Sequence, residues 1–324
     1  MTQRRLGRTD LQISPLGLGC WQFSEGRGLI GGFWEALPQD RVDAIVKAAL
    51  EGGVTWFDTA EAYGKGRSEQ ALAHGLEVGG KRPGEVVVAT KWQPFGRTAR
   101  SITETIRARA EALAPYPIDL HQVHHWAGLS FVEAEMRAMA DLVSAGRIRA
   151  VGVSNFGASR MRRAHGALAK RGIPLASNQM QYSLLDRRIE RNGVLAAAKE
   201  LGVTIIAYSP LAQGILSGKF HDDPSLIRRA PGPRRFMPAF RARGLARTRP
   251  LVTELKAIAA AHGATPSQVA LAWLVTFHGD TVVAIPGATR PHHARESAAA
   301  MGLALSPREL ERLDELSRAA APRA

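Results

Sequence analysis

Val54-Thr55-Trp56-Phe57-Asp58 is a short apolar run that ends on a carboxylate, and it follows a helical pattern over residues 39–51 and a turn at Gly52-Gly53. Within 39–51 the apolar residues recur at the spacing of one helix face, and glycines are common where helices end. The same order of helix, turn and buried strand recurs along the chain. Such alternation predicts parallel strands that are joined by helices.

The recurring unit predicts eight strands, with helices between them. Eight such units predict a closed (β/α)8 barrel, here a single domain over residues 1–324 with an N-terminal hairpin over 4–14. A doubly wound sheet is the competing fold, but Gly17–Gln22 lacks the third glycine of a dinucleotide fingerprint. Strands are expected near 16–19, 54–58, 86–90, 118–124, 148–153, 175–179, 203–207 and 282–286. Helices are expected at about 39–51, 67–78, 100–113, 130–145, 157–171 and 188–201.

Composition limits the classes of function. With 45% hydrophobic residues the chain can bury a sizeable core, and it lacks the run of about 18 apolar residues that would predict a membrane span. Its start shows no signal-peptide pattern, and a lone cysteine, Cys20, excludes an intrachain disulfide, so we expect a cytoplasmic protein. The formal charge of +14 is concentrated in Arg228–Arg249, which holds eight arginines and no acid. We therefore expect no nucleic-acid partner, and the oligomeric state stays open.

Two long insertions, 22–38 and 221–250, interrupt the regular spacing. Each follows the carboxyl end of a predicted strand, so we expect both to overhang that end of the barrel, as binding loops or as solvated loops. The second is rich in arginine and proline, which pack poorly in a core. We therefore expect that Leu226–Arg247 can be deleted without unfolding the barrel.

Four side chains follow or close the first predicted strands: Asp58, Tyr63, Lys91 and His124. The carboxyl ends of parallel barrel strands are where active sites lie. A phenol with a nearby ammonium acquires a lower pKa, and a carboxylate keeps that ammonium charged. Together with a histidine that hydrogen-bonds the phenol or a substrate oxygen, these groups predict general acid catalysis by Tyr63. The alternative is a structural Asp58–Lys91 ion pair with a core histidine.

These residues belong to motifs that resemble the aldo-keto reductase superfamily, in the family's order and over nearly the whole chain. The opening Leu6-Gly7-Arg8-Thr9 is similar to the bacterial branch related to potassium-channel β subunits. The resemblance implies NAD(P)H-dependent reduction of an aldehyde or ketone, or else a cofactor-binding regulatory subunit with slow chemistry. The motifs are Gly53–Ala60 with Tyr63-Gly64 and Ser68-Glu69, Ala89–Lys91, Ile118–Leu120 with His124, Gly152–Phe156, and Ala207–Leu211.

The same resemblance implies a cofactor site. Ser154, Asn155 and Gln179 would bind the carboxamide and Tyr208 would stack on the nicotinamide. The pyrophosphate and adenosine phosphate would lie against Ser209, Leu211, Gln213, Gly214, Leu216, Ser217, Gly287, Thr289, Arg290, His293 and Glu296. NADPH is preferred and NADH is the alternative, because Arg290 stands one position away from the family's usual basic residue. If protonated His293 contacts the 2′-phosphate, that preference should weaken as pH rises through the ordinary histidine range.

Tryptophans and histidines complete the candidate site. Trp21, Trp92 and Trp126 each lie at or near a predicted strand end, where they line a substrate pocket for a small carbonyl compound or pack loops over the barrel. His121, His124 and His125 do not predict a metal site. Strand alternation puts residues 121 and 125 on one face of the strand and residue 124 on the other. No cysteine or carboxylate stands at ligand spacing from them.

Overall fold

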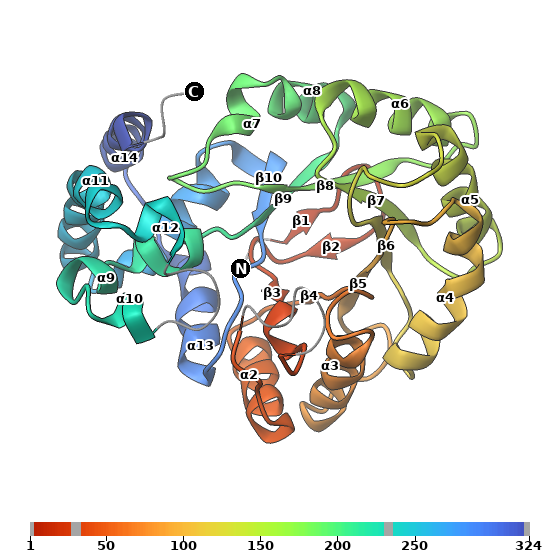
Figure 1. The fold of residues 1–324 in the computed structure, drawn as a ribbon, viewed down its shortest axis with the longest axis horizontal. Coiled ribbons are helices and arrows are strands. Elements are labelled where there is room, and N and C mark those ends of the chain that lie inside the picture. The colour runs from red at the N-terminus through yellow and green to blue at the C-terminus, as the bar shows by residue number, and fades with distance from the viewer. Residues whose placement is uncertain (1–2, 27–33, 230–235, 321–324) are drawn as a thin grey trace.

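The structure is a computed structural model that describes residues 3–26, 34–229 and 236–320. Within these ranges eight parallel strands follow one another in chain order around a ring (Figure 1). Backbone bridges from Leu16 to Ala284 and from Gly19 to Gly287 join the last strand to the first, so the ring closes. The strands are β3 (Leu18–Gly19), β4 (Trp56–Asp58), β5 (Val87–Trp92), β6 (Leu120–Val123), β7 (Ala150–Ser154), β8 (Leu175–Gln181), β9 (Thr204–Tyr208) and β10 (Val282–Ala284).

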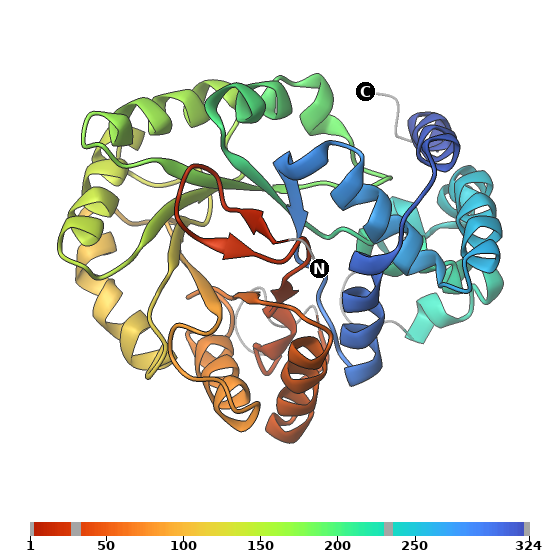
Figure 2. The same ribbon diagram turned by 180° about the vertical axis from the view of Figure 1, so that it is seen from behind.

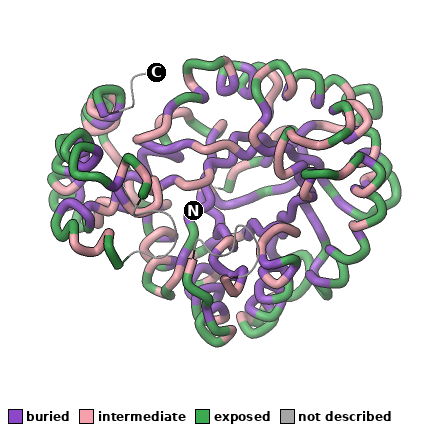
Figure 3. The backbone as a smooth tube through the Cα atoms, viewed as in Figure 1, coloured by how far each residue is buried: buried purple, intermediate pink, exposed green. Residues whose placement is uncertain are grey.

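Amphipathic helices surround the strands. Their apolar faces pack inward and their outer faces meet solvent, which Figure 3 shows as a buried ring inside an exposed rim. The long helices are α2 (Gln39–Glu51), α3 (Arg67–Val78), α4 (Arg100–Leu113), α5 (Val132–Ser144), α6 (Ala158–Ala169), α8 (Val194–Leu201), α11 (Ala242–Ala261), α12 (Pro266–Thr276), α13 (Pro291–Ala299) and α14 (Pro307–Ala320). Short turns are η1 (Trp21–Phe23), α7 (Arg188–Arg191), η2 (Ala212–Ser217), α9 (Lys219–Asp222), α10 (Leu226–Arg229), η4 (Pro238–Phe240), η5 (Gly279–Thr281) and η6 (Ala300–Gly302).

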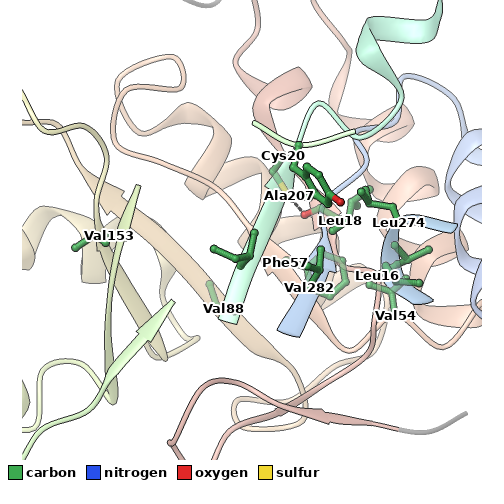
Figure 4. Close-up of a cluster of buried hydrophobic side chains, with 14 of the residues drawn as sticks. Leu16, Leu18, Cys20, Val54, Phe57, Val88, Val153, Ala207, Leu274 and Val282 are labelled. Carbon is green, nitrogen blue, oxygen red and sulfur yellow. Dashed lines mark hydrogen bonds between the residues drawn. The ribbon is translucent and has the colours of Figure 1, made fainter. Parts of the chain in front are cut away.

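Alternation along each strand divides the core into two layers. Outward side chains such as Phe57 and Val88 pack against the helices, in the cluster that Figure 4 shows with the buried Cys20. Inward side chains such as Trp56 fill the barrel from its amino end. The same alternation points Asp58 inward, above Trp56, toward the carboxyl end.

A hairpin of β1 (Arg4–Arg5) and β2 (Gln12–Ile13) closes the amino end of the barrel. Figure 2 shows it lying across the middle of the ring. Its Leu6, Leu11 and Ile13 join the interior layer, so that end is sealed and the opposite end is left for chemistry.

The barrel, its eight strands and the hairpin are confirmed as the sequence predicts. The single helix expected over 188–201 is wrong, because the chain forms α7 and α8 with a break between them. Gly193 lies in that break with φ +81°, a left-handed conformation that glycine adopts without strain.

The expectation of one long loop over 221–250, whether a binding loop or a solvated loop, is also wrong for its second part. From Ala242 the chain is the start of α11, whose Leu245 packs with Phe240 and Ile215 in a small core of its own. The helix turns its arginines to solvent, so arginine content does not prevent packing. Deletion of Leu226–Arg247 would remove Phe240 and Leu245 from this small core, and folding of the barrel without the segment stays a prediction. Residues 230–235, and 27–33 of the first insertion, lie outside the described residues.

No helix in the described ranges is both long and apolar enough to cross a membrane.

Candidate active site

Lys91 is the centre of a buried cluster at the carboxyl end of the barrel. Its side chain is 0% exposed and forms an ion pair with Asp58, which is 1% exposed. The Lys91 ammonium also donates to the backbone oxygen of Thr59 at 2.8 Å and to the hydroxyl of Tyr63 at 3.4 Å. It lies 4.9 Å from the centre of the Tyr63 ring. The structure thus brings together three of the four residues that the sequence singles out.

Two amides hold the second oxygen of Asp58. The side-chain nitrogens of Gln122 and Gln179 each donate to Asp58 Oδ2 at 2.9 Å. These bonds fix the carboxylate so that its other oxygen faces Lys91. Sequence reasoning missed Gln122, although alternation places residue 122 on the same strand face as His124. Gln179, expected to bind a carboxamide, has its nitrogen engaged inside the barrel.

The charges of this cluster follow from burial and from its one ion pair. Burial opposes the charge on Lys91, but Asp58 and Tyr63 together outweigh burial, and the pKa of the ammonium is raised. Burial also raises the pKa of Tyr63, and Lys91 counters it only in part. The expected net lowering of the Tyr63 pKa is therefore not found. Tyr63 is a neutral phenol at neutral pH, the form that donates a proton.

His124 lies beside the phenol. It directly follows β6, its backbone nitrogen donates to the oxygen of Trp92 at 3.0 Å, and its ring meets the Tyr63 ring edge-on at 5.6 Å between centroids. Burial and the neighbouring Lys91 hold the pKa of His124 well below its ordinary value. The imidazole is therefore neutral, and its Nδ1 has no hydrogen-bond partner among the described residues. A neutral imidazole can donate to a substrate oxygen without adding charge.

The three tryptophans have different surroundings. Trp21 stacks on Tyr63 with ring centroids 6.3 Å apart, so it borders the reacting group. Trp126 is 53% exposed and contacts His125 at the rim. Trp92 points outward from β5, where it is fully buried and its Nε1 donates to Ser101 of α4 at 3.0 Å. The expectation that Trp92 lines the pocket is wrong, because Lys91 takes the inward position and alternation sends its neighbour to the helix layer.

Polar groups from β7 and β9 form one network beside the cluster. The Tyr208 hydroxyl donates to Asn155 Oδ1 at 2.9 Å, and Asn155 Nδ2 donates to Ser154 Oγ at 3.0 Å. The Ser154 hydroxyl donates to the backbone oxygen of Gln179 at 3.0 Å. Asn155 has φ +60°, which is uncommon for a residue with a side chain and is found at functional sites.

The segment after β9 has an unusual backbone. Ser209, Ala212 and Gln213 have positive φ values of 52°, 46° and 57°, and Gly214 follows at 97°. Within this turn the Ala212 N–H donates to the Ser209 oxygen and the Gly214 N–H to the Leu211 oxygen, each at 2.9 Å. Leu216 is fully buried, and its backbone N–H donates to the Leu211 oxygen at 3.3 Å. The Ser217 hydroxyl donates to the Gly214 oxygen at 2.7 Å.

A group of cationic side chains lies at the start of α13. Arg290 is exposed at the N-cap position next to Thr289, whose hydroxyl is 3.4 Å from His293 Nδ1. Burial, the neighbouring His292 and Lys219 lower the pKa of His293, so its titration lies below the ordinary histidine range. Lys219, which sequence reasoning missed, is the first residue of α9, one residue after η2. Its amine would be 3.7 Å from a Cβ at Gly214.

Glu296 and Gly287, both expected to bind the cofactor, contact other residues of the chain. Glu296 accepts a hydrogen bond from the Thr265 hydroxyl, which ties α13 to the start of α12. Gly287 lies against Gln22, because a Cβ added there would meet the Gln22 amide at 2.3 Å.

Taken together, these groups fit a dinucleotide with phosphate groups. Uncharged amide and hydroxyl groups adjoin Tyr63, and a turn with positive φ values follows. Arg290 and His293 lie at the N-terminus of α13, which favours anions, and the charge of Lys219 acts on His293. Across the described residues, no three His, Cys, Asp or Glu side chains gather as a metal ion would need.

Comparison with known proteins gives matches over nearly the full length. The model of the Aldo/keto reductase family matches residues 15–318. An uncharacterized oxidoreductase of Mycobacterium bovis is 39% identical over 311 residues, which are 96% of this chain and 91% of that protein. The chloroplastic pyridoxal reductase of Arabidopsis thaliana is 33% identical over 318 residues, 94% of this chain and 83% of that one.

Two solved structures share the fold. A thermostable aldo-keto reductase, solved with the inhibitor epalrestat, has a TM-score of 0.75 at 30% identity and covers 98% of this chain and 100% of its own. The glycerol dehydrogenase of Gluconobacter oxydans has a TM-score of 0.82 at 25% identity, with 97% and 94% coverage.

Proposed function

The chain belongs to the aldo/keto reductase family and is an oxidoreductase, and from that premise we propose that it reduces an aldehyde or ketone to the alcohol with NAD(P)H. The observation that carries the proposal is the buried contact of Lys91 with both Asp58 and Tyr63. An ion pair buried this deeply is costly to fold, and one that touches a neutral phenol is typical of a proton-transfer site.

Each residue of the cluster has one task in this reaction. The nicotinamide supplies hydride to the carbonyl carbon when it is bound. Tyr63 gives its proton to the carbonyl oxygen as negative charge develops there. The Lys91 ammonium stabilises the phenolate that remains, and Asp58 keeps Lys91 in place. His124, neutral and with a free ring nitrogen, donates to the carbonyl oxygen and orients it. In the reverse direction Tyr63 acts as the base.

For the cofactor we propose NADPH over NADH. Arg290 is exposed at the start of α13, and Lys219 and His293 lie close enough to interact through their charges. A 2′-phosphate at the start of α13 would meet the charge of Arg290 and the positive end of the helix dipole. The family resemblance would place the pyrophosphate beside the turn at Ala212–Gly214. We further propose that the chain acts as one catalytic domain in the cytoplasm.

The test is a cofactor titration followed by a substrate panel. Quenching of tryptophan fluorescence gives the dissociation constants of NADPH and NADH, since Trp21 borders the site. Oxidation of the tighter cofactor is then followed with benzaldehyde, pyridoxal and glyceraldehyde. The last two are chosen because relatives are named for pyridoxal reduction and glycerol oxidation. Turnover of at least one aldehyde is expected. Tight cofactor binding without turnover would favour the regulatory-subunit alternative instead.

A further inference from the structure

We propose that Glu61 and Arg97 are positioning residues for the general acid, and that their ion pair holds the turn that carries Tyr63 against the end of β5. This inference deepens the proposed function, in which Tyr63 donates the proton. The turn in question comprises residues 59–66 and is called the Tyr63 turn below.

The Tyr63 turn lies between a strand and a helix and belongs to neither. β4 ends at Asp58 and α3 begins at Arg67. Inside the turn, the Tyr63 N–H donates to the Ala60 oxygen at 3.0 Å and the Gly66 N–H to the Glu61 oxygen at 3.2 Å. These bonds shape the turn, but they do not fix its place relative to Lys91. Contacts with β5 must do that.

Thr59, at the start of the turn, makes two such contacts: its N–H donates to the Ala89 oxygen at 2.9 Å, and its oxygen accepts from the Lys91 ammonium at 2.8 Å. Glu61 makes the others, on both sides of Trp92. Its backbone N–H donates to the Lys91 oxygen at 3.2 Å. Its side-chain Oε2 accepts the Gln93 backbone N–H at 3.1 Å. Glu61 therefore binds the Tyr63 turn to the backbone of Lys91 and Gln93 at the end of β5. Lys91 is also the residue that the Tyr63 hydroxyl contacts.

Arg97 fastens Glu61 to the helix layer. One guanidinium nitrogen donates to Glu61 Oε1 at 2.8 Å and to the Gln93 oxygen at 3.1 Å. The other two nitrogens donate to hydroxyls of α4, to Ser101 at 3.1 Å and to Thr105 at 3.0 Å. The guanidinium also lies 5.7 Å from the Trp92 ring. All three nitrogens are thus used, which is how an arginine acts as a rigid connector.

The contact that this pair supports is a weak one. Lys91 and Tyr63 are 3.4 Å apart, at the long end of hydrogen-bond distances, so their own attraction does not define the geometry. The Arg97–Glu61 pair has side chains only 24% and 20% exposed, which reduces solvent screening of its charges. A displacement of about 1 Å can lower a rate by about a hundredfold. Loss of the pair should therefore slow proton transfer while cofactor binding stays intact.

The experiment compares Arg97→Ala, Arg97→Lys, Glu61→Gln and the Arg97→Ala/Glu61→Gln double variant with the wild-type chain. Arg100→Ala is the matched control, because Arg100 begins α4, the helix that Arg97 contacts, but pairs with Glu104 in solvent. The first measurement is backbone hydrogen exchange of the Tyr63 turn by mass spectrometry, with NADPH bound. The second is kcat and KM for benzaldehyde, together with the dissociation constant of NADPH.

We expect Arg97→Ala to lower kcat by at least about tenfold, since misplacement of a catalytic group lowers the rate steeply. NADPH affinity should stay unchanged, and exchange in the turn should be faster. Arg97→Lys should recover part of the loss, and the double variant should be no worse than Arg97→Ala, because the two residues act as one unit. Arg100→Ala should match the wild type in every measurement.

Two results would overturn the inference: wild-type exchange in the Tyr63 turn of Arg97→Ala, or equal losses of kcat in Arg97→Ala and Arg100→Ala. If Arg97→Ala does not fold, Glu61→Gln carries the same comparison, because it keeps the size of the side chain and the bond from Gln93. If the wild type reduces no aldehyde, the proposed function fails, while the exchange measurement still decides whether the pair holds the turn.

Discussion

Replacing Tyr63 by phenylalanine removes the proposed proton donor and little else. The ring keeps its stacking on Trp21 and its edge contact with His124. Among the described residues, the only hydrogen bond lost is the one from Lys91 at 3.4 Å, worth about 1 kcal/mol of folding free energy at most for so long a bond. Folding and NADPH affinity should therefore stay close to wild type.

The loss of rate should be far larger than the loss of stability. General acid catalysis contributes about a hundredfold to ten-thousandfold, which is about 3–5 kcal/mol of activation free energy. No other described group can replace the donor, since Lys91 is tied to Asp58 and His124 is neutral. We expect kcat for benzaldehyde to fall by at least about a hundredfold.

The assay is steady-state turnover with NADPH and with NADPH deuterated at the transferred position, so that a rate limited by chemistry shows an isotope effect. Tyr116→Phe is the matched control, because the Tyr116 hydroxyl donates to the Lys81 oxygen at 2.6 Å, away from the cluster. If Tyr63→Phe keeps wild-type kcat where the isotope effect is present, Tyr63 is not the acid.

Three further predictions follow from the site and its surroundings. Gln122→Met removes one amide from Asp58 and should lower kcat by about tenfold, in the range of one lost hydrogen bond to a charge, with NADPH affinity unchanged in fluorescence titration. The NADPH preference should grow as pH falls below the ordinary histidine range, because the pKa of His293 is lowered and its imidazole is protonated only at lower pH. Titrations of both cofactors across pH should show that His293→Ala flattens this dependence. If the pH dependence persists in the variant, His293 is not its source. Burial raises the pKa of Glu69 from 4.5 to about 7, against the opposing effect of Arg109. The neutral form is thus favoured in the fold, so stability should fall by up to about 3 kcal/mol as pH rises from about 4.5 to 7. Glu69→Gln should remove that slope in urea unfolding measured across pH, and an unchanged slope would show that Glu69 titrates normally.

The barrel was readable from the sequence because its signals are local. Helical spacing over 39–51, the glycines after it and the apolar run to Asp58 all lie within one unit, and the unit recurs. The same local pattern put Asp58, Lys91 and His124 at strand ends, so the candidate cluster was predictable as a set. The break between α7 and α8 and the packing of α11 were not predictable. The number of arginines in a segment does not say whether they lie on the solvent face of a helix.

Only the tertiary structure decided how the cluster is held. Gln122 and Gln179 reach Asp58 from 64 and 121 residues away along the chain, and no spacing rule connects them. Trp92 and Lys91 are neighbours whose opposite directions depend on where β5 ends. The protonation state of Tyr63 was also decided by the tertiary structure. The sequence indicated an ammonium that would lower the pKa of Tyr63, but burial, which depends on the surrounding strands, outweighs that ammonium and keeps the phenol neutral.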